Sequence, residues 1–224
     1  IIQNNIYGVD IEKGAVDIAR LRFWLSIVVD EDIPSPLPNL DYKIMQGNSL
    51  IESFQGLDLS ELTYKRVSKK DRGEVMLFDD EKNRLQKTVS QLLSTYYSCS
   101  EHERKLRLRK QISDAINQQL EAQFVNSSIL TKLKDIDLAG NSQFFLWHTW
   151  FSDVFNREDG KSGFDIVIGN PPYVFARNSK DKGFTKEDKK YYYDNFQLAK
   201  YQVNLYHLFV EQGVRFLSNE GIFA

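Results

Sequence analysis

The sequence predicts an α/β fold whose sheet is mostly parallel and is interrupted by a long helical insertion. A strand–helix–strand order occurs twice, in residues 1–46 and in residues 164–224, and this order is typical of parallel sheets. Residues 166–169 form an apolar run typical of a central strand buried on both faces. The stretch between the two halves lacks proline and is rich in charged residues and leucine, which favours helices.

Composition bounds the class of protein. The 224 residues are 42% hydrophobic and 27% charged, and the mean hydropathy is -0.45, which excludes a disordered chain, a collagen and a membrane bundle. The net charge of -2 and the isoelectric point near 6.0 give no overall basic footprint for nucleic acid. The single cysteine, Cys99, cannot form an internal disulfide, which suits the cytoplasm. The longest apolar stretch, residues 21–29, is too short to span a membrane.

We expect a first core part at residues 1–56, a helical insertion at 57–140 and a second core part at 141–224. In the first part, residues 1–10 are expected to form a strand ending in a carboxylate, followed by a helix over residues 11–29. The prolines after this helix end it, because proline lacks an amide hydrogen and disfavours helix before it. The apolar face expected to be buried comprises Ile11, Ala15, Ile18, Arg22, Leu25 and Val29. A short strand over 42–46 and a turn at 47–49 complete this part.

The insertion is expected to be an antiparallel pair of helices. Two apolar stripes can pack on each other if a short turn joins the helices. The sequence Ser100-Glu101-His102-Glu103 has the spacing of a capping box, which predicts the start of the second helix. The basic run at residues 105–110 favours a solvated helix face over a phosphate contact. The stripes comprise Leu85, Val89, Leu92 and Tyr96 in the first helix and Leu108, Ile112, Ala115 and Phe124 in the second.

The second core part opens with an aromatic cluster at residues 144–151, for which core packing is the favoured interpretation. A buried strand follows and ends at Gly169. A later helix is expected over residues 201–217, then a turn at 218–221 and a final strand at 222–224. Tyr191, Tyr192 and Tyr193 are equally compatible with stacking on bases and with packing on the sheet. One side of the later helix is expected to carry Leu205, Leu208 or Phe209, Gln212 and Phe216.

The residues that carry chemistry follow the buried strand directly. Pro171 and Pro172 fix two φ angles and lack amide donors, and open α/β sheets bind ligands at the carboxyl ends of their strands. Asn170 offers a side-chain carbonyl and Pro171 a backbone carbonyl as acceptors, and Tyr173 offers a flat ring. This set suits an amino group on an aromatic heterocycle. Accepting both amino hydrogens frees the nitrogen lone pair for attack and stabilises the positive charge that develops.

The segment Gly169-Asn170-Pro171-Pro172-Tyr173 resembles motif IV of the amino-group DNA methyltransferases, which methylate adenine N6 with S-adenosyl-L-methionine as the donor. With the insertion before it, the chain is most similar to the adenine methylase part of fused type II restriction–modification enzymes. The resemblance implies a Rossmann-like methyltransferase sheet. It also implies that Asn170, Pro171, Pro172 and Tyr173 are the catalytic residues.

The same resemblance implies a cofactor site in the first core part. Residues 6–11 (IYGVDI) are similar to motif II, in which the acidic residue, here Asp10, binds the ribose hydroxyls, with Ile11 beside it. A helix N-cap is the alternative role for Asp10. Residues 46–50 (QGNSL) stand at the place of motif III, which assigns Asn48 and Ser49 to the cofactor. Many relatives have Asp at the position of Asn48. Residues 204–206 resemble motif V, which packs along cofactor and base.

Motif I, the glycine-rich loop that wraps the methionine end of the cofactor, is expected before Ile1, because no Gly-x-Gly occurs in the chain. We therefore expect a catalytic-core fragment that is inactive alone and binds the cofactor weakly. The implied partner is double-stranded DNA with the target adenine flipped onto Tyr173. The basic stretch at residues 177–190 is expected to contact phosphates.

Two other interpretations stay open. A glutamine methyltransferase acting on release factors also uses an Asn-Pro-Pro-Tyr turn, because an amide nitrogen poses the same chemical problem, although such enzymes usually lack a long insertion between strand motifs. A non-catalytic module that presents the helical hairpin to a partner is the second alternative. His102, His148 and His207 are scattered and accompanied by a single cysteine, so neither a metal site nor a nucleophilic triad is expected.

Overall fold

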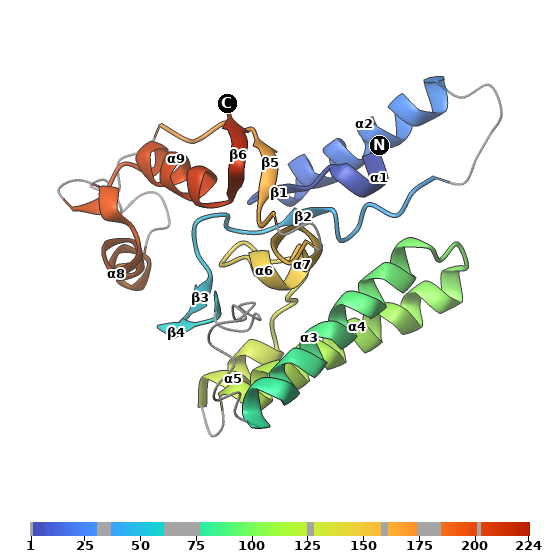
Figure 1. The fold of residues 1–224 in the computed structure, drawn as a ribbon, viewed down its shortest axis with the longest axis horizontal. Helices are drawn as coiled ribbons and strands as arrows, with labels where there is room; N and C mark the ends of the chain where they lie inside the picture. Colours follow the sequence, from blue (N-terminus) through green and yellow to red (C-terminus); the bar gives the residue numbers. More distant parts are fainter. Residues whose placement is uncertain are drawn as a thin grey trace.

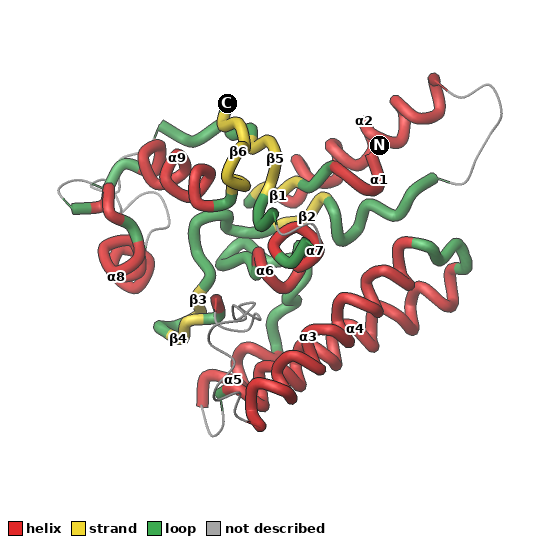
Figure 2. Tube along the Cα trace, viewed as in Figure 1, coloured by secondary structure: helices red, strands yellow, loops and turns green. Residues whose placement is uncertain are grey.

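The computed structural model describes residues 2–30, 37–60, 77–124, 128–157, 161–173, 185–200 and 203–224 (Figure 1). The fold is mixed α/β, with long helices around short strands (Figure 2). The helices are α1 (Ile2–Asn5), α2 (Lys13–Asp30), α3 (Leu77–Tyr97), α4 (His102–Gln123), α5 (Ser128–Lys134), α6 (Trp147–Trp150), α7 (Ser152–Phe155), α8 (Lys186–Asn195), the 3-10 helix η4 (Gln197–Ala199) and α9 (Leu205–Arg215). The strands are β1 (Gly8–Asp10), β2 (Ile44–Gln46), β3 (Ser53–Phe54), β4 (Leu57–Asp58), β5 (Phe164–Val167) and β6 (Leu217–Phe223).

The strands form two parallel pairs and one antiparallel pair. β1 pairs with β2 in a register that places Gly8 opposite Ile44, and β5 pairs with β6. The short hairpin of β3 and β4 is antiparallel. The rings of Tyr7, just before β1, and Phe164 in β5 meet edge to face with centroids 5.6 Å apart, so the two parallel pairs lie side by side (Figure 1). The parallel arrangement expected from the sequence is therefore confirmed for each pair.

The first expected strand is shorter than predicted. Residues 2–5 form the helix α1, and only Gly8–Asp10 are extended. The polar run at residues 3–5 interrupts apolar alternation and has low strand propensity. Ile2 and Ile6 instead pack against a small cluster of Val16, Leu40 and Ile44, so this segment closes one end of the core.

The prediction of which side of α2 is buried is wrong. The four large aliphatic side chains of the expected stripe, Ile11, Ile18, Leu25 and Val29, are between 47% and 82% exposed. The opposite side packs inward, with Val16 buried and Ala19, Phe23 and Trp24 against the same cluster. Arg20 on this side donates to the carbonyls of Asp41 and Ile44. Apolar residues surround this helix, so their spacing did not distinguish the two faces.

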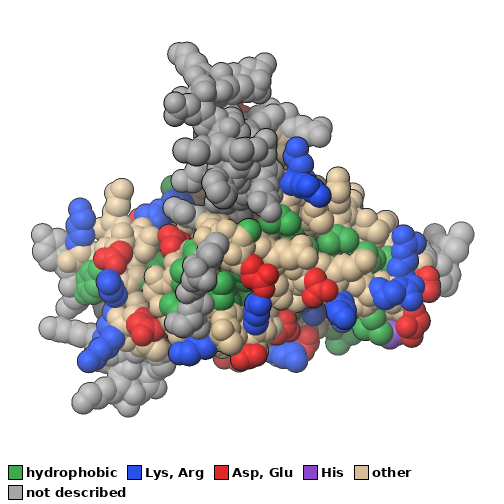
Figure 3. Space-filling view, turned by 90° about the horizontal axis from the view of Figure 1, so that it is seen from below, with side chains coloured by type: hydrophobic (Ala, Val, Ile, Leu, Met, Phe, Trp, Pro, Cys, Tyr) green, Lys and Arg blue, Asp and Glu red, His purple; other side chains and the backbone are tan. Residues whose placement is uncertain are grey.

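The helical hairpin of α3 and α4 forms as expected and lies at one edge of the molecule (Figure 1). The stripe of α3 centres on Val89, Leu93 and Tyr96, all buried, and that of α4 includes the buried Leu108 and Ile112 as expected. Acidic and basic side chains are interspersed on the face in Figure 3, which is seen from the side where the hairpin lies in Figure 1.

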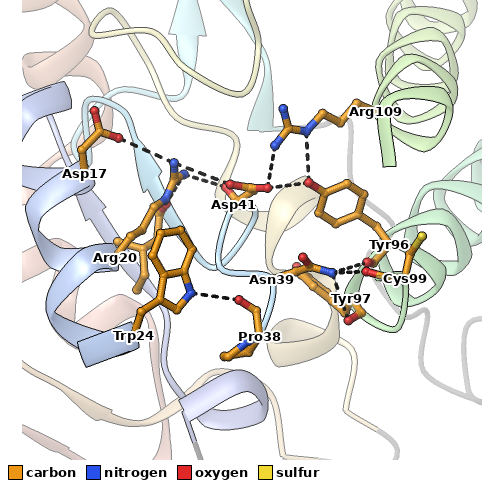
Figure 4. A network of polar contacts seen from close by, with 11 residues as sticks. Asp17, Arg20, Trp24, Pro38, Asn39, Asp41, Tyr96, Tyr97, Cys99 and Arg109 are labelled. Atoms are coloured by element: carbon orange, nitrogen blue, oxygen red, sulfur yellow. Dashed lines mark hydrogen bonds and ion pairs between the residues drawn. The ribbon is translucent and has the colours of Figure 1, made fainter. Parts of the chain in front are cut away.

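The expected capping box at the start of α4 does not form. The N-cap is Glu101, one residue later than expected, and no side-chain hydrogen bond caps it. The turn before α4 is instead held from outside, because Asn39 donates to the carbonyls of Tyr96, Tyr97 and Cys99 (Figure 4). These are carbonyls that a helix end leaves without intrahelical partners.

A second polar contact joins the hairpin to the first core part (Figure 4). The carboxylate of Asp41 accepts from Arg109 of α4 at 2.6 Å and from the hydroxyl of Tyr96 of α3. Arg20 of α2 approaches the other carboxylate oxygen at 3.8 Å, and Trp24 donates to Pro38. Three helices therefore meet at the segment that precedes β2.

The strand β5 is less buried than predicted. Ile166 is 60% exposed and Ile168, just after the strand, is 80% exposed, and both line a large cavity. The expected turn at residues 218–221 lies within β6, where the register shifts. Phe164 is paired with Leu217 and Ile166 with Ile222. Residues 218–221 therefore form a bulge opposite the single residue Asp165.

The aromatic cluster is part of the main core, as expected. Phe144, Phe145, Trp150 and Phe151 are buried, and Trp147 packs against them. The helix expected at residues 201–217 is α9, which begins later, at Leu205. The side expected to carry Leu205, Leu208 and Phe216 is buried. Residues 201 and 202 lie outside the described residues.

Candidate functional site

A cavity of about 1320 Å³ opens at the carboxyl ends of β1 and β5. One wall consists of the end of β1 and the turn after β2, and the facing wall of the end of β5 and the residues that follow it. The helices α8 and α9 and the hairpin of β3 and β4 complete the lining. This is the edge at which open α/β sheets bind ligands.

The structure brings most of the expected site residues to this one cavity. Both walls contribute, although their residues lie far apart in the sequence. Tyr173 is not part of the lining; its ring is 82% exposed beside the cavity. The expected residues that line it are Asp10, Ile11, Asn48, Ser49, Asn170, Pro171 and Pro172.

Asp10 ends β1 with one carboxylate oxygen engaged. Its Oδ1 accepts from the amide of Glu12 at 2.8 Å, a local contact of the kind that precedes a helix. The backbone carbonyl of Asp10 accepts from the amide of Gly47 at 2.9 Å. The side chain of Gln46 donates to the carbonyl of Ile11 at 3.0 Å. The loop between β1 and α2 is thereby tied to the turn after β2.

The turn after β2 is held by its own side chain. Asn48 Oδ1 accepts from the amide of Leu50 at 3.1 Å, and the Asn48 side chain also hydrogen-bonds with the hydroxyl of Tyr192. The carbonyl of Ser49 accepts from the indole nitrogen of Trp147 at 3.0 Å. The side chain of Asn48 therefore has a structural role in this turn.

Gly47 lets this turn approach the core. A Cβ built on Gly47 would lie 2.5 Å from the ring of Phe145, closer than carbon atoms approach without displacement. Phe145 is 2% exposed and its amide donates to the carbonyl of Ile51 at 2.9 Å, so the ring has no room to retreat. The short distance between the cavity wall and the aromatic core requires glycine here.

The facing wall ends in Asn170 and Pro171, which we call the rim. The pairing of β5 and β6 continues to this point, since Gly169 donates to the carbonyl of Ala224 at 3.1 Å. Asn170 is exposed and Pro171 is half-buried. Among the described residues, neither the Asn170 side chain nor the Pro171 carbonyl takes part in a hydrogen bond. Both residues line the cavity.

Sequence reasoning missed α8 as a wall of this cavity. Thr185 accepts from the amide of Asp188 at 3.0 Å, and Asp188 accepts from the amide of Thr185 at 2.8 Å. This capping box starts α8, and its Thr-x-x-Asp spacing is a recognised sequence signal. Tyr191 and Tyr192 of α8 line the cavity, whereas Tyr193 does not.

Tyr191 and Tyr192 of α8 pack into the protein, whereas Tyr193 is exposed. Tyr192 is 1% exposed, and the hydroxyl of Tyr191 accepts from the amide of Glu52 at 3.2 Å. Burial raises the pKa of Tyr191 to about 12 and raises that of Tyr192 further. Both remain neutral at physiological pH, and packing is the better interpretation of these two.

The charged lining of the cavity is mostly acidic. An acidic cavity attracts cationic ligands and repels phosphates. The expected phosphate-binding residues Arg177, Lys180 and Lys182 lie outside the described residues, and Lys189 is in α8. The charged residues of the described lining are Asp10, Asp58, Glu187, Asp188, Asp194 and Lys190.

The described residues show neither a membrane helix nor a metal cluster. None of the helices in the described ranges combines the length and apolar character needed to cross a bilayer. The same ranges bring no group of three His, Cys, Asp or Glu side chains together in an arrangement that could hold a metal ion.

The described residues form an α/β fold with a large cavity at the ends of parallel strands, which is the place where proteins of this fold class commonly bind ligands. The Eco57I restriction-modification methylase family matches residues 4–224. The chain belongs to this family.

A curated relative agrees with this family. The chain is 25% identical over 271 aligned positions to a protein of Methanocaldococcus jannaschii named "Putative type II restriction enzyme and methyltransferase". The alignment covers 99% of this chain and 21% of the relative, so the chain spans about a fifth of that protein's length. No solved structure matches the chain.

Proposed function

We propose that the chain is the catalytic core of a DNA methyltransferase of a restriction–modification system. Within the complete gene product, this core transfers a methyl group from S-adenosyl-L-methionine to adenine N6 in a specific double-stranded sequence, in the cytoplasm. The observation that carries the proposal is the rim of Asn170 and Pro171, whose free acceptors stand across one cavity from Asp10. We also propose that the two parallel pairs belong to one Rossmann-like sheet, into which residues 57–140 are inserted.

The wall at the end of β1 fits this cofactor. Among the described contacts, Asp10 uses Oδ1 alone, which leaves Oδ2 to accept from a ribose hydroxyl. The acidic lining favours a cation. S-adenosyl-L-methionine supplies an electrophilic methyl group on a positively charged sulfur. Asn48 is engaged by Leu50 and Tyr192, so backbone groups of this turn are better placed than the Asn48 side chain to contact the cofactor adenine.

The rim performs the step that the target amine needs. An aromatic amine is a weak nucleophile because its lone pair is delocalised into the ring. Asn170 Oδ1 and the Pro171 carbonyl accept one amine hydrogen each, which favours a tetrahedral nitrogen with its lone pair free. The same acceptors stabilise the positive charge that develops on nitrogen. One preorganised contact of this kind contributes about 3 kcal/mol to catalysis.

The cavity is large enough for a base as well as a cofactor. Small-molecule sites commonly occupy about 300–1000 Å³, and this cavity is about 1320 Å³. The amino group of adenine is paired inside the duplex, so the target nucleotide must be flipped out at a cost of a few kcal/mol. Stacking on the exposed ring of Tyr173 offsets this cost by about 1–3 kcal/mol.

Asn170→Ala tests the proposal in the complete gene product. We expect methyl transfer to DNA, measured with a labelled donor, to fall by about a hundredfold, with unchanged thermal unfolding. Asn219→Ala is the matched control, because Asn219 is exposed on β6 and does not line the cavity. Digestion of the product should yield N6-methyladenine. Wild-type-like transfer by Asn170→Ala, or methylation of protein glutamine instead of adenine, would contradict the proposal.

A further inference from the structure

Tyr173 is stacked on a second ring outside the Asn-Pro-Pro-Tyr segment. The rings of Tyr173 and Tyr206 lie nearly parallel, with centroids 5.5 Å apart and an interplanar angle of 16°. Tyr206 belongs to the first turn of α9, more than thirty positions further along the chain. The contact is therefore tertiary, and it joins the rim to a helix that lines the cavity.

The position of Tyr206 is fixed by the start of α9. Asn204 is the N-cap, and its side chain accepts from the amide of Tyr206 at 3.1 Å. The neighbouring Leu205 is 7% exposed and Leu208 is 0% exposed, both within the main core. The ring of His207 meets that of Tyr206 edge to face, with centroids 5.8 Å apart. The turn is anchored on both sides, so the Tyr206 ring stays beside the rim.

Tyr173 lacks comparable support of its own. Pro171 and Pro172 fix the backbone before it but not the torsion angles of its side chain. Tyr173 is 82% exposed, and Ile168, five positions earlier, is 80% exposed. Among the described residues, the Tyr206 ring is its one aromatic contact. A free tyrosine ring would sample several orientations, which a base would have to fix on binding.

We propose that Tyr206 is a positioning residue that holds the Tyr173 ring so that its open face receives the target base. This inference rests on the function proposed above. Tyr206 covers one face of Tyr173, and the high exposure leaves the other face free. The base completes a stack in the order Tyr206, Tyr173, base. Because the ring is already oriented, base binding loses less side-chain freedom.

The opposite role for Tyr206 is a plug that occupies the place of the base. The anchored turn argues against it, because displacing the ring would disturb the cap at Asn204 and the buried Leu205. The two roles also predict opposite results. Removing a plug strengthens base binding, whereas removing a support weakens it.

The test uses Tyr206→Leu, which removes the flat face but keeps apolar volume, and Tyr206→Phe, which keeps the ring. We expect Tyr206→Leu to raise the KM for DNA about tenfold with a smaller change in kcat. It should also weaken the fluorescence rise of 2-aminopurine at the target position. Tyr206→Phe should behave as wild type. If Tyr206→Leu lowers the unfolding temperature, Tyr206→Met replaces it, since methionine favours helices.

A double-mutant cycle separates positioning from a general structural role. In a Tyr173→Leu background, Tyr206→Leu should have little further effect, because Tyr206 acts through the Tyr173 ring. Val214→Ala is the control, since Val214 is exposed on the same helix as Tyr206 and lies outside the cavity lining. Additive effects, an unchanged Tyr206→Leu enzyme or tighter DNA binding would overturn the inference.

The two proposals fail in distinguishable ways. If the wild-type protein methylates adenine and Asn170→Ala does not, but the cycle shows no coupling between Tyr173 and Tyr206, the positioning role alone is wrong. If the wild-type protein yields no N6-methyladenine, the proposed function is wrong and the positioning role is withdrawn with it.

Discussion

The junction around Asp41 and the rim at Asn170 use polar groups in opposite ways. At the junction each oxygen of the Asp41 carboxylate faces a cation, Arg109 on one side and Arg20 on the other. At the rim the Asn170 side chain and the Pro171 carbonyl have no partner among the described residues. Polar groups that hold a fold are paired within it, whereas groups that act on a ligand are kept exposed and unpaired.

The largest effect should come from breaking the junction. Asp41→Ala leaves Arg109, Tyr96 and Arg20 without their shared acceptor, and we expect the free energy of unfolding to fall by about 3 kcal/mol. Urea unfolding measures the change. Asp114→Ala is the control, since Asp114 is exposed on the same helix as Arg109. A loss as small as that of Asn170→Ala, within about 0.5 kcal/mol, would remove the contrast between the two regions.

The second effect is alkaline destabilisation. Burial, together with the hydrogen bond and the charge of Asp41, raises the pKa of Tyr96 to about 12. Burial also raises the pKa values of Tyr42 and Tyr97. Above pH 10 these tyrosines ionise first in the unfolded chain. Stability should therefore fall by about 1.4 kcal/mol per pH unit for each such group. Burial lowers the pKa of Lys43, which acts in the opposite direction but through a single group.

Unfolding midpoints at pH 8, 10 and 11 test this slope. The midpoint should change little from pH 8 to pH 10 on account of these tyrosines and fall beyond pH 10. Tyr97→Phe removes one hydroxyl, which donates to the carbonyl of Tyr42 at 3.1 Å, and should flatten the fall. A midpoint that stays constant up to pH 11 would show that Tyr42, Tyr96 and Tyr97 have the same pKa values in the folded and the unfolded chain.

The smallest effect concerns a buried pair inside the hairpin. Gln119 donates to Gln86 at 3.0 Å, and both side chains are buried. Among the described residues, the Gln86 Nε2 and Gln119 Oε1 atoms have no hydrogen-bond partner, so the pair bears a desolvation cost. We expect the double variant Gln86→Leu with Gln119→Leu to gain about 1 kcal/mol of stability. Each single variant should lose stability, and a destabilised double variant would contradict this account.

Local sequence signals predicted the elements that local interactions determine. The turn at Gly47, the hairpin helices, the strand before Asn170 and the buried side of α9 all appear where the pattern indicates. Thr185 shows that one such signal was available and unused, since its spacing to Asp188 is that of a capping box. The site residues were expected from the resemblance to amino-group methyltransferases, and all of them except Tyr173 line one cavity.

Other features depend on contacts between distant residues. Asp41 and Arg109 are separated by 68 positions, and no periodicity relates them. The buried face of α2 includes Arg20, which reaches the carbonyl of Ile44, and apolar spacing does not reveal this contact. The stack of Tyr173 on Tyr206 could likewise be read only from the structure.

The chain segments before and after the helical hairpin meet, and this has a consequence for the order of folding. Gly140 forms a bridge with Gln46, and Phe145 donates to Ile51 at 2.9 Å. Helical hairpins rich in local contacts form within microseconds to milliseconds. Once formed, the hairpin shortens the effective loop between the two parallel strand pairs, and each halving of loop length saves about 0.6 kcal/mol of closure entropy. The hairpin thereby assists contacts between chain segments that lie far apart in the sequence.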